Sequence, residues 1–173
     1  MVSAALLRHL RRRAGIVVLV ALLAGPSAAA NARPRDDSRR PWATVNVCDT
    51  AAAPNTIGIR ASMPGSRSGQ EEMYMRFVVQ YFSRADEHWH RIAASDSGYL
   101  YVGRGRRPRQ FGRSFRIEPG PGEPVLLRGL VLFQWRVKST VVRQESARTR
   151  RGHRSNAGAD PPGYSASTCT VTP

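Results

Sequence analysis

The amino-acid sequence predicts a single all-β domain, an antiparallel β-sandwich, in a chain of 173 residues. Apolar and polar residues alternate with a period of two in several segments, whereas helical periodicity is weak. Clusters of Gly, Pro, Ser and Asp separate these segments, as turns between antiparallel strands do. Short strands joined in this way are typical of a sandwich that is immunoglobulin-like in architecture. A small β-barrel or a jelly roll is the alternative.

Residues 1–30 have the three zones of a secretory signal peptide. Four arginines among residues 8–13 precede an uncharged apolar core at 14–24, and a Gly-Pro pair ends that core. Small residues follow and predict cleavage at Ala30 or Ala32. The core is shorter than the roughly 18–20 residues that span a bilayer, so we expect no stable membrane span after cleavage. The protein is therefore expected to be extracytoplasmic, either secreted or associated with the cell envelope.

Two further segments follow the expected cleavage site. Residues 31–41 are polar, charged and Pro-containing, which predicts a disordered leader. Residues 42–173 are expected to form the β-sandwich domain, beginning at Trp42.

The two strongest strand predictions are residues 73–81 and 127–137. Every odd position of 73–81 is apolar or aromatic, whereas Arg76 and Gln80 face the other way. The odd positions of 127–137 also carry an apolar face, with Gly129 as its one gap. A slip of one residue would turn arginine side chains into the core, so the register of both strands is well specified.

Shorter strands and turn chemistry account for the rest of the domain. Strands are expected at residues 43–48, 56–63, 87–94, 98–102, 110–117, 140–147 and 164–172. Ser95–Gly98 is expected to be a tight turn, and Gly/Pro-rich loops are expected at 64–69, 103–108 and 119–124. A longer polar stretch, Arg148–Gly163, precedes the last strand.

One predicted strand, residues 110–117, has a conflict between its two faces. Phe111, Arg113 and Phe115 share parity, so a regular strand that buries both phenylalanines also buries the arginine. A β-bulge at Gly112 would relieve this conflict.

The only two cysteines, Cys48 and Cys169, predict a disulfide. Each lies in strand-type sequence, one near the start of the domain and one near its end, in a chain expected to be exported. The bridge would join the first and last strands and close a loop of roughly 120 residues. Two cysteines also exclude a disulfide-dense miniprotein and any multi-cysteine metal site.

Two resemblances follow from these features. The many short strands, Trp135 in a long mid-chain strand and the terminal cysteines resemble immunoglobulin-like and fibronectin-type-III-like sandwiches. Asp160, Tyr164 and Cys169 resemble the Asp…Tyr…Cys strand of immunoglobulin domains, although the spacing from Tyr164 to Cys169 is longer. Other stretches are similar to uncharacterised exported Arg-rich bacterial proteins, namely residues 55–60, 133–135 and 152–160. The resemblances imply a sandwich and export, and they imply no activity.

Positive charge dominates the composition, with 27 Lys and Arg against 12 Asp and Glu. Only Lys138 is a lysine, whereas a binding surface selected for charge alone would tolerate both Lys and Arg. So extreme a bias toward Arg, beside many Ala, Gly and Pro, is more typical of a GC-rich genome, and it weakens the inference from charge to a nucleic-acid partner. Basic and aromatic side chains concentrate in one region, whose candidate polyanion-binding residues are Arg104, Arg106, Arg107, Arg109, Tyr99 and Tyr101. An extracellular partner of this kind would be a cell-wall polymer, an acidic polysaccharide or released nucleic acid.

Candidate catalytic and metal-binding residues are few. Asp86, His88 and His90 would share one face of a strand and are weak candidates for a metal site, because His153 is the only further histidine of the predicted domain and lies on a distant loop. No nucleophile elbow and no facing pair of carboxylates is evident. The three tryptophans are expected in the core and not in a carbohydrate-binding platform.

The sequence therefore predicts an exported, non-catalytic binding or structural module of the cell envelope or extracellular space, with no cofactor. A polyanion-binding protein that uses residues 104–116 is one alternative. A small secreted hydrolase or a metal-binding protein is the other.

Overall fold

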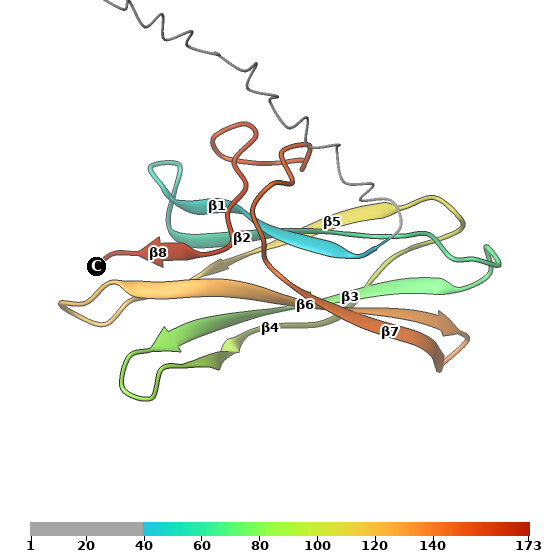
Figure 1. Ribbon diagram of the computed structural model, residues 1–173, viewed down its shortest axis with the longest axis horizontal. Helices are drawn as coiled ribbons and strands as arrows, with labels where there is room; N and C mark the ends of the chain where they lie inside the picture. Colours follow the sequence, from blue (N-terminus) through green and yellow to red (C-terminus); the bar gives the residue numbers. More distant parts are fainter. Residues whose placement is uncertain (1–39) are drawn as a thin grey trace, which may run out of the picture. The chain divides into compact units, whose positions relative to one another are not determined.

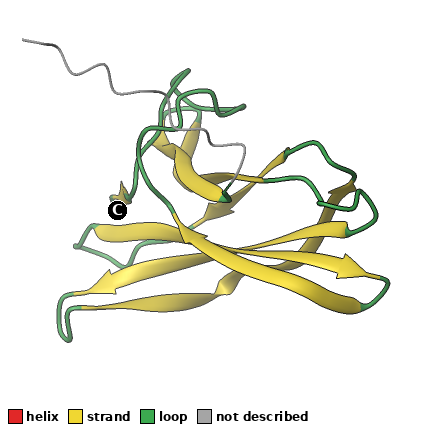
Figure 2. Cartoon of the chain, turned by 45° about the vertical axis from the view of Figure 1, so that its right-hand side comes forward, coloured by secondary structure: helices red, strands yellow, loops and turns green. Residues whose placement is uncertain are grey.

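The computed structural model describes residues 40–173, which form two antiparallel β-sheets packed against each other (Figure 1). The sheets are not closed into a barrel, so the predicted sandwich is confirmed. The part of the chain that the structure describes consists of strands and loops (Figure 2) and contains no helix that could cross a membrane. The predicted signal peptide and nearly all of the predicted leader lie outside the described residues.

The described residues form eight strands. These are β1 (Trp42–Thr50), β2 (Ala53–Met63), β3 (Glu72–Ser83), β4 (His88–Arg104), β5 (Arg109–Arg116), β6 (Val125–Val137), β7 (Thr140–Arg148) and β8 (Cys169–Val171). The three-stranded sheet has the order β1-β2-β5. The five-stranded sheet has the order β4-β3-β6-β7, and β8 also pairs with β6.

The core lies between the inner faces of the two sheets. The odd positions of β3, from Met73 to Val79, are fully buried, and so are Val131 and Phe133 of β6. β3 and β6 pair along ten residues without a register shift, and this pairing keeps both apolar faces on the same side. Trp135 is also buried there, and its indole Nε1 donates to the carbonyl oxygen of Pro64 at 3.2 Å. The two strongest strand predictions are therefore confirmed.

The predicted tight turn at Ser95–Gly98 is wrong, because β4 runs through it without reversing. The turn-forming side chains instead support irregular pairing with β3, whose register shifts on both sides of the Val78–Asp96 pair. Ser97 Oγ accepts from the backbone N–H of Phe77 at 2.9 Å, and Asp96 Oδ1 accepts from that of Gly98 at 3.0 Å. The side chains thus satisfy backbone groups that a regular ladder would have paired.

The predicted bulge at Gly112 is also wrong. β5 pairs with β2 in unbroken register, with Arg113 opposite the buried Ile59. Arg113 therefore has the parity of the core face, yet it is exposed. β5 is an edge strand, so a long side chain can reach solvent past the rim of the sandwich without any backbone irregularity.

The last predicted strand, 164–172, is a strand only from Cys169 to Val171. The preceding residues cross the outer edge of β1, where Val45 and Ala166 exchange two backbone hydrogen bonds. This C-terminal segment also covers polar side chains on the outer face of β1: Thr44 Oγ1 and Ser165 Oγ lie 2.7 Å apart, and Thr44 is fully buried. Irregular chain thus replaces a fourth strand along β1.

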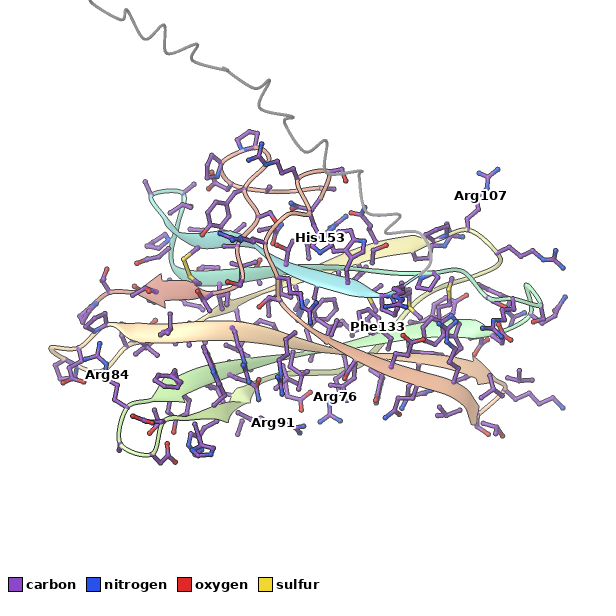
Figure 3. The ribbon with its side chains drawn as sticks, in the orientation of Figure 1. Arg76, Arg84, Arg91, Arg107, Phe133 and His153 are labelled. Atoms are coloured by element: carbon purple, nitrogen blue, oxygen red, sulfur yellow. A yellow bond between two sulfur atoms is a disulfide. The ribbon has the colours of Figure 1, made fainter. Side chains whose placement is uncertain are left out.

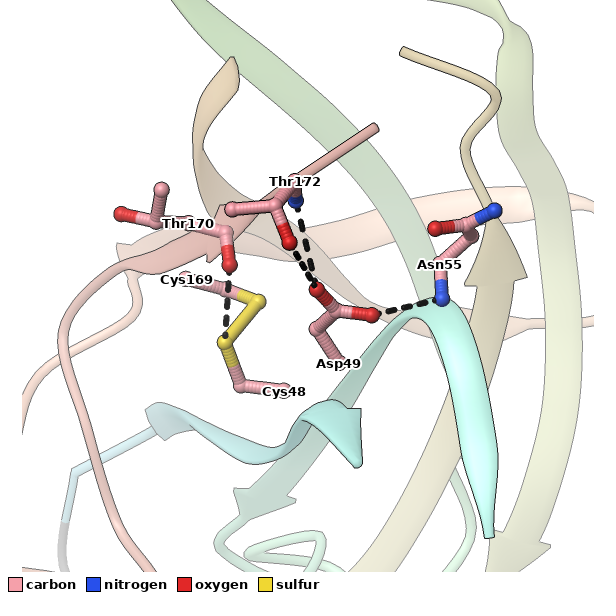
Figure 4. The surroundings of a disulfide bond; sticks show 6 residues. All are labelled: Cys48, Asp49, Asn55, Cys169, Thr170 and Thr172. Carbon is pink, nitrogen blue, oxygen red and sulfur yellow. Dashed lines mark hydrogen bonds between the residues drawn. A yellow bond between two sulfur atoms is a disulfide. The ribbon is translucent and has the colours of Figure 1, made fainter. Parts of the chain in front are cut away.

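The predicted disulfide between Cys48 and Cys169 is confirmed, with the two Cα atoms 5.4 Å apart (Figure 4). It joins the end of β1 to the start of β8. Beside it, the Asp49 carboxylate accepts from the backbone N–H of Asn55 at 2.7 Å and from that of Thr172 at 3.2 Å. The bridge and this carboxylate together attach the C-terminal strand to the β1–β2 turn.

The depressed pKa values of two carboxylates, Asp49 and Asp96, allow the pH dependence of stability to be predicted. The N–H groups of Asn55 and Thr172 lower the pKa of Asp49, and the Arg76 guanidinium lowers the pKa of Asp96. Because both values are depressed in the folded state, the unfolded chain binds protons more readily in acid. We expect the free energy of unfolding to be level at neutral pH and to fall as the pH drops below about 4.

Urea unfolding measured across a pH series tests this expectation. Asp49→Asn and Asp96→Asn should each flatten the acid decline, whereas Glu123→Gln, in an exposed loop, should leave it unchanged. An acid decline of the same steepness in both aspartate variants would contradict this explanation.

Candidate anion-binding surface

The structure separates the residues predicted to bind a polyanion. Tyr99 and Tyr101 lie on β4, on the outer face of the five-stranded sheet, opposite Arg76 and Tyr74 of β3. Arg107 lies in the β4–β5 loop and extends away from that face, whereas Arg76 projects from it (Figure 3). The loop itself is held against the β2–β3 loop by a hydrogen bond from Ser66 N–H to Gly105 O at 2.8 Å.

Several arginines of the predicted segment already have partners within the domain. Arg104 forms an ion pair with Glu72 at 2.7 Å, and Arg116 forms one with Glu118 at 2.8 Å. Arg109 donates to the carbonyl oxygen of Arg104 at 3.2 Å. Residues 104–116 therefore do not form one continuous cationic surface.

A different set of arginines lies across the outer face of the five-stranded sheet at the end near Trp89. Arg91 of β4 and Arg128 of β6 both lie opposite Gln80 of β3, and Arg148 of β7 lies opposite the next outward residue of β6. We call Arg91, Arg128 and Arg148 the arginine row. Figure 3 shows Arg91 on the side of this sheet that faces away from the other one.

Within residues 40–173, no member of the arginine row has an ion pair with a carboxylate. Arg128 lies over the Trp89 ring, 4.1 Å from its centroid, and donates from Nε to Gln80 Oε1 at 2.9 Å. Partial burial lowers the pKa of Arg128, and the positive charge of Arg148 lowers it further. These neighbouring guanidiniums repel each other, so an anion between them would be stabilised by both.

The rest of this face is a network of arginine and aromatic side chains. Two guanidiniums lie against the Tyr99 ring, with Arg76 5.7 Å and Arg136 4.9 Å from its centroid. Arg136 also lies 4.2 Å from the Tyr74 ring, and Arg76 is ion-paired with Asp96. Arg76 and Arg136 thus already interact with partners within the domain. The arginine row differs because it forms no ion pair with a carboxylate among residues 40–173.

A groove of about 1250 Å³ includes two members of the row. It runs from Trp89 and Arg128 past Arg148 to Arg150 and to Trp42 at the start of β1. Glu145 is the only carboxylate among the described residues that line it, and Arg143 neutralises that group. The groove is therefore cationic along its length.

The three tryptophans do not form an exposed carbohydrate platform. Trp135 is in the core, as expected, and Trp42 is buried beneath His153, with the two ring centroids 4.3 Å apart. The expectation that all three tryptophans lie in the core is wrong for Trp89, which is half-buried on the outer face of β4 with Arg128 over its ring.

The candidate metal ligands lie at the β3–β4 turn. Asp86 is in the turn and not on a strand, and its Oδ2 contacts His90 Nε2 at 2.8 Å. His88 Nδ1 contacts the backbone oxygen of Asp86. Residues 40–173 contain no group of three His, Cys, Asp or Glu side chains arranged to hold a metal ion.

No known family model matches the sequence, and no curated protein shows significant similarity to it. Membership of an immunoglobulin-like family or of a family of exported Arg-rich proteins therefore stays a prediction. The function is inferred from the geometry and charge of the surface.

Proposed function

We propose that this domain is a non-catalytic extracytoplasmic module that binds an anionic polymer through the arginine row. An extracytoplasmic location is supported by the Cys48–Cys169 disulfide, since such bonds persist in oxidising compartments. Cell-wall polymers, acidic polysaccharides and released nucleic acid are the anionic polymers of that environment.

The observation that carries the proposal is the unequal pairing of arginines on one sheet face. Arg76 and Arg104 form ion pairs with carboxylates, whereas within residues 40–173 Arg91, Arg128 and Arg148 form none. Arg91 is close enough to Asp96 to lower the pKa of that carboxyl, but Asp96 is ion-paired with Arg76. A half-buried guanidinium beside a second positive charge, as at Arg128, is costly in a free protein, and a bound anion would offset that cost. The place of the row on three strands of one sheet gives it a fixed spacing, as a binding surface requires.

Binding should be governed by salt, because each neutralised anion releases counterions. We expect the affinity for heparin, for teichoic-acid-type polymers or for duplex DNA to fall steeply as salt is raised. Replacing Arg91 and Arg148 by Ala should weaken binding. It should also lower the slope of log K against log salt by about one for each anionic group that is no longer neutralised. Fluorescence anisotropy over a salt series measures both quantities.

The matched control is the double variant Arg106→Ala and Arg107→Ala, which removes the same charge from an exposed loop. It should bind like the parent protein if the arginine row is the site. Loss of binding in the loop variant alone would assign the site to residues 104–116 instead. Absence of binding to every anionic polymer at low salt would refute the proposed function.

A further inference from the structure

The two sheets have four edges, and three of them are poorly suited to pairing with another chain; the fourth is formed by β7, with the short β8 further along β6. The outer edge of β1 is occupied by the C-terminal segment, through bridges to Thr149, Asp160 and Ala166. β4 has repeated register shifts and two glycines with positive φ. β5 carries three arginines and no acidic residue, so a second copy of it would place like charges together.

The edge of β7, unlike the other three edges, is suited to pairing with another strand. Within residues 40–173, no strand pairs with its outer side. Val141 and Val142 are 43% and 51% exposed, although valine is a strand-forming apolar residue. A register shift opposite Trp135 and Arg136 makes an irregularity near Val142, and the pairing from Arg143 to Arg148 is regular.

The charges of β7 are complementary to a second copy of the same strand. Arg143 and Glu145 lie two residues apart on one face and form an ion pair within the strand. In an antiparallel pair centred on Gln144, Arg143 of each copy lies opposite Glu145 of the other. Centring the pair on Arg143 or on Glu145 would instead place identical charges opposite each other.

We infer that two copies of this chain associate along β7, as an antiparallel pair centred on Gln144. The register shift near Val142 limits this matched register to Arg143, Gln144 and Glu145, and the exposed valines lie at the two ends of that pairing. The four charges form one alternating network in place of two separate pairs. The two five-stranded sheets join into one continuous sheet.

The two-fold axis of this pair is perpendicular to the sheet, so both outer faces point the same way. The arginine rows of the two copies would then lie on one surface, and a long polymer could contact both with a gain in avidity. This consequence, unlike the dimer itself, rests on the proposed function. Arg91 of β4 and Arg128 of β6 are not on the β7 edge, so the second copy would leave them open.

Sedimentation equilibrium without any polymer tests the dimer separately from the proposed function. We expect the parent protein to show a dimer mass, and we expect Arg143→Glu and Glu145→Arg each to weaken association roughly tenfold or more, because like charges then face each other. An equimolar mixture of these two variants should recover the dimer mass, since every reversed charge faces its opposite on the other variant.

The control is Arg113→Glu, which reverses an exposed charge on the other free edge, β5, and should leave the dimer mass unchanged. Circular dichroism of each single variant checks that the sandwich persists, because Arg143 also lies 4.0 Å from the Trp135 ring centroid. A monomeric parent protein, a dimer that survives both single substitutions, or a mixture that stays monomeric would each overturn the inference.

Discussion

Loss of the Cys48–Cys169 disulfide should lower the free energy of unfolding by up to about 4–5 kcal/mol. The bridge joins residues 121 positions apart, so it restricts almost the whole unfolded domain. The entropy that the bridge removes from the unfolded chain grows only with the logarithm of the loop length. The figure is an upper bound, because measured effects of disulfides are often smaller than this entropy estimate. For a domain that is typically stable by about 5–15 kcal/mol, such a loss approaches the threshold of folding.

Urea unfolding of the variant Cys48→Ala with Cys169→Ala measures this effect. Its transition should move to lower urea, and its m-value should rise because the unfolded chain is no longer cross-linked. Added reductant should shift the parent protein in the same direction and should leave the variant unaffected. A transition that does not move in either experiment would contradict a stabilising role for the bridge.

The parts of the fold that can be predicted from sequence are those in which one face of a strand is apolar. β3 and β6 are the central strands of the larger sheet, and all odd positions of Met73–Val79 and of Leu127–Trp135 are buried. The cysteines are equally informative, because in a chain predicted to be exported each of two lone cysteines has only one possible intramolecular partner. Local pattern and long-range pairing agree at these positions.

Two of the wrong predictions, the turn at 95–98 and the bulge at Gly112, concern positions where tertiary context overrides local sequence. Asp96, Ser97 and Gly98 have the composition of a turn, but a bulged strand uses the same side chains to satisfy unpaired backbone groups. Arg113 has inward parity, which in a central strand would require a bulge. It needs none here, since an edge strand leaves part of its inner face open to water.

The candidate surface could not be predicted because it depends on the order of strands. Arg91, Arg128 and Arg148 are far apart in the sequence and become neighbours only through the pairing of β4, β3, β6 and β7. The cluster at 104–116 is dense in sequence, yet two of its arginines are neutralised by carboxylates. From the sequence alone, only Arg128 could be placed on this outer face, because it lies at an even position of a strand whose odd positions are apolar.

Gly129 shows how an apparent defect in a pattern can be a packing requirement. It is the one gap in the apolar face of β6, and a Cβ at this position would lie 2.7 Å from Ile59 Cδ1 and 2.8 Å from Thr149 Cγ2. Thr149 also accepts a hydrogen bond from the Gly129 N–H at 3.1 Å, which holds the end of β7 close to β6. The space that the glycine leaves is thus filled by two neighbouring side chains.

We therefore expect Gly129→Ala to lower the free energy of unfolding by about 1–3 kcal/mol, the cost of overpacking a core, although it completes the apolar pattern. Gly120→Ala is the matched control, since a Cβ there meets no atom within 4 Å, and it should change stability by less than about 0.5 kcal/mol.

A compensating variant identifies the cause. Ile59→Val removes Cδ1, and Thr149→Ser removes Cγ2 but keeps the hydroxyl that accepts from Gly129. Alone, Ile59→Val should cost about 0.5–1.5 kcal/mol, as the loss of a buried methyl group does. Combined with Gly129→Ala, the two substitutions should cost less than the sum of the separate effects, because the added methyl group occupies the space that they vacate. Strictly additive losses in urea unfolding would contradict the steric clash as the reason for glycine at this position.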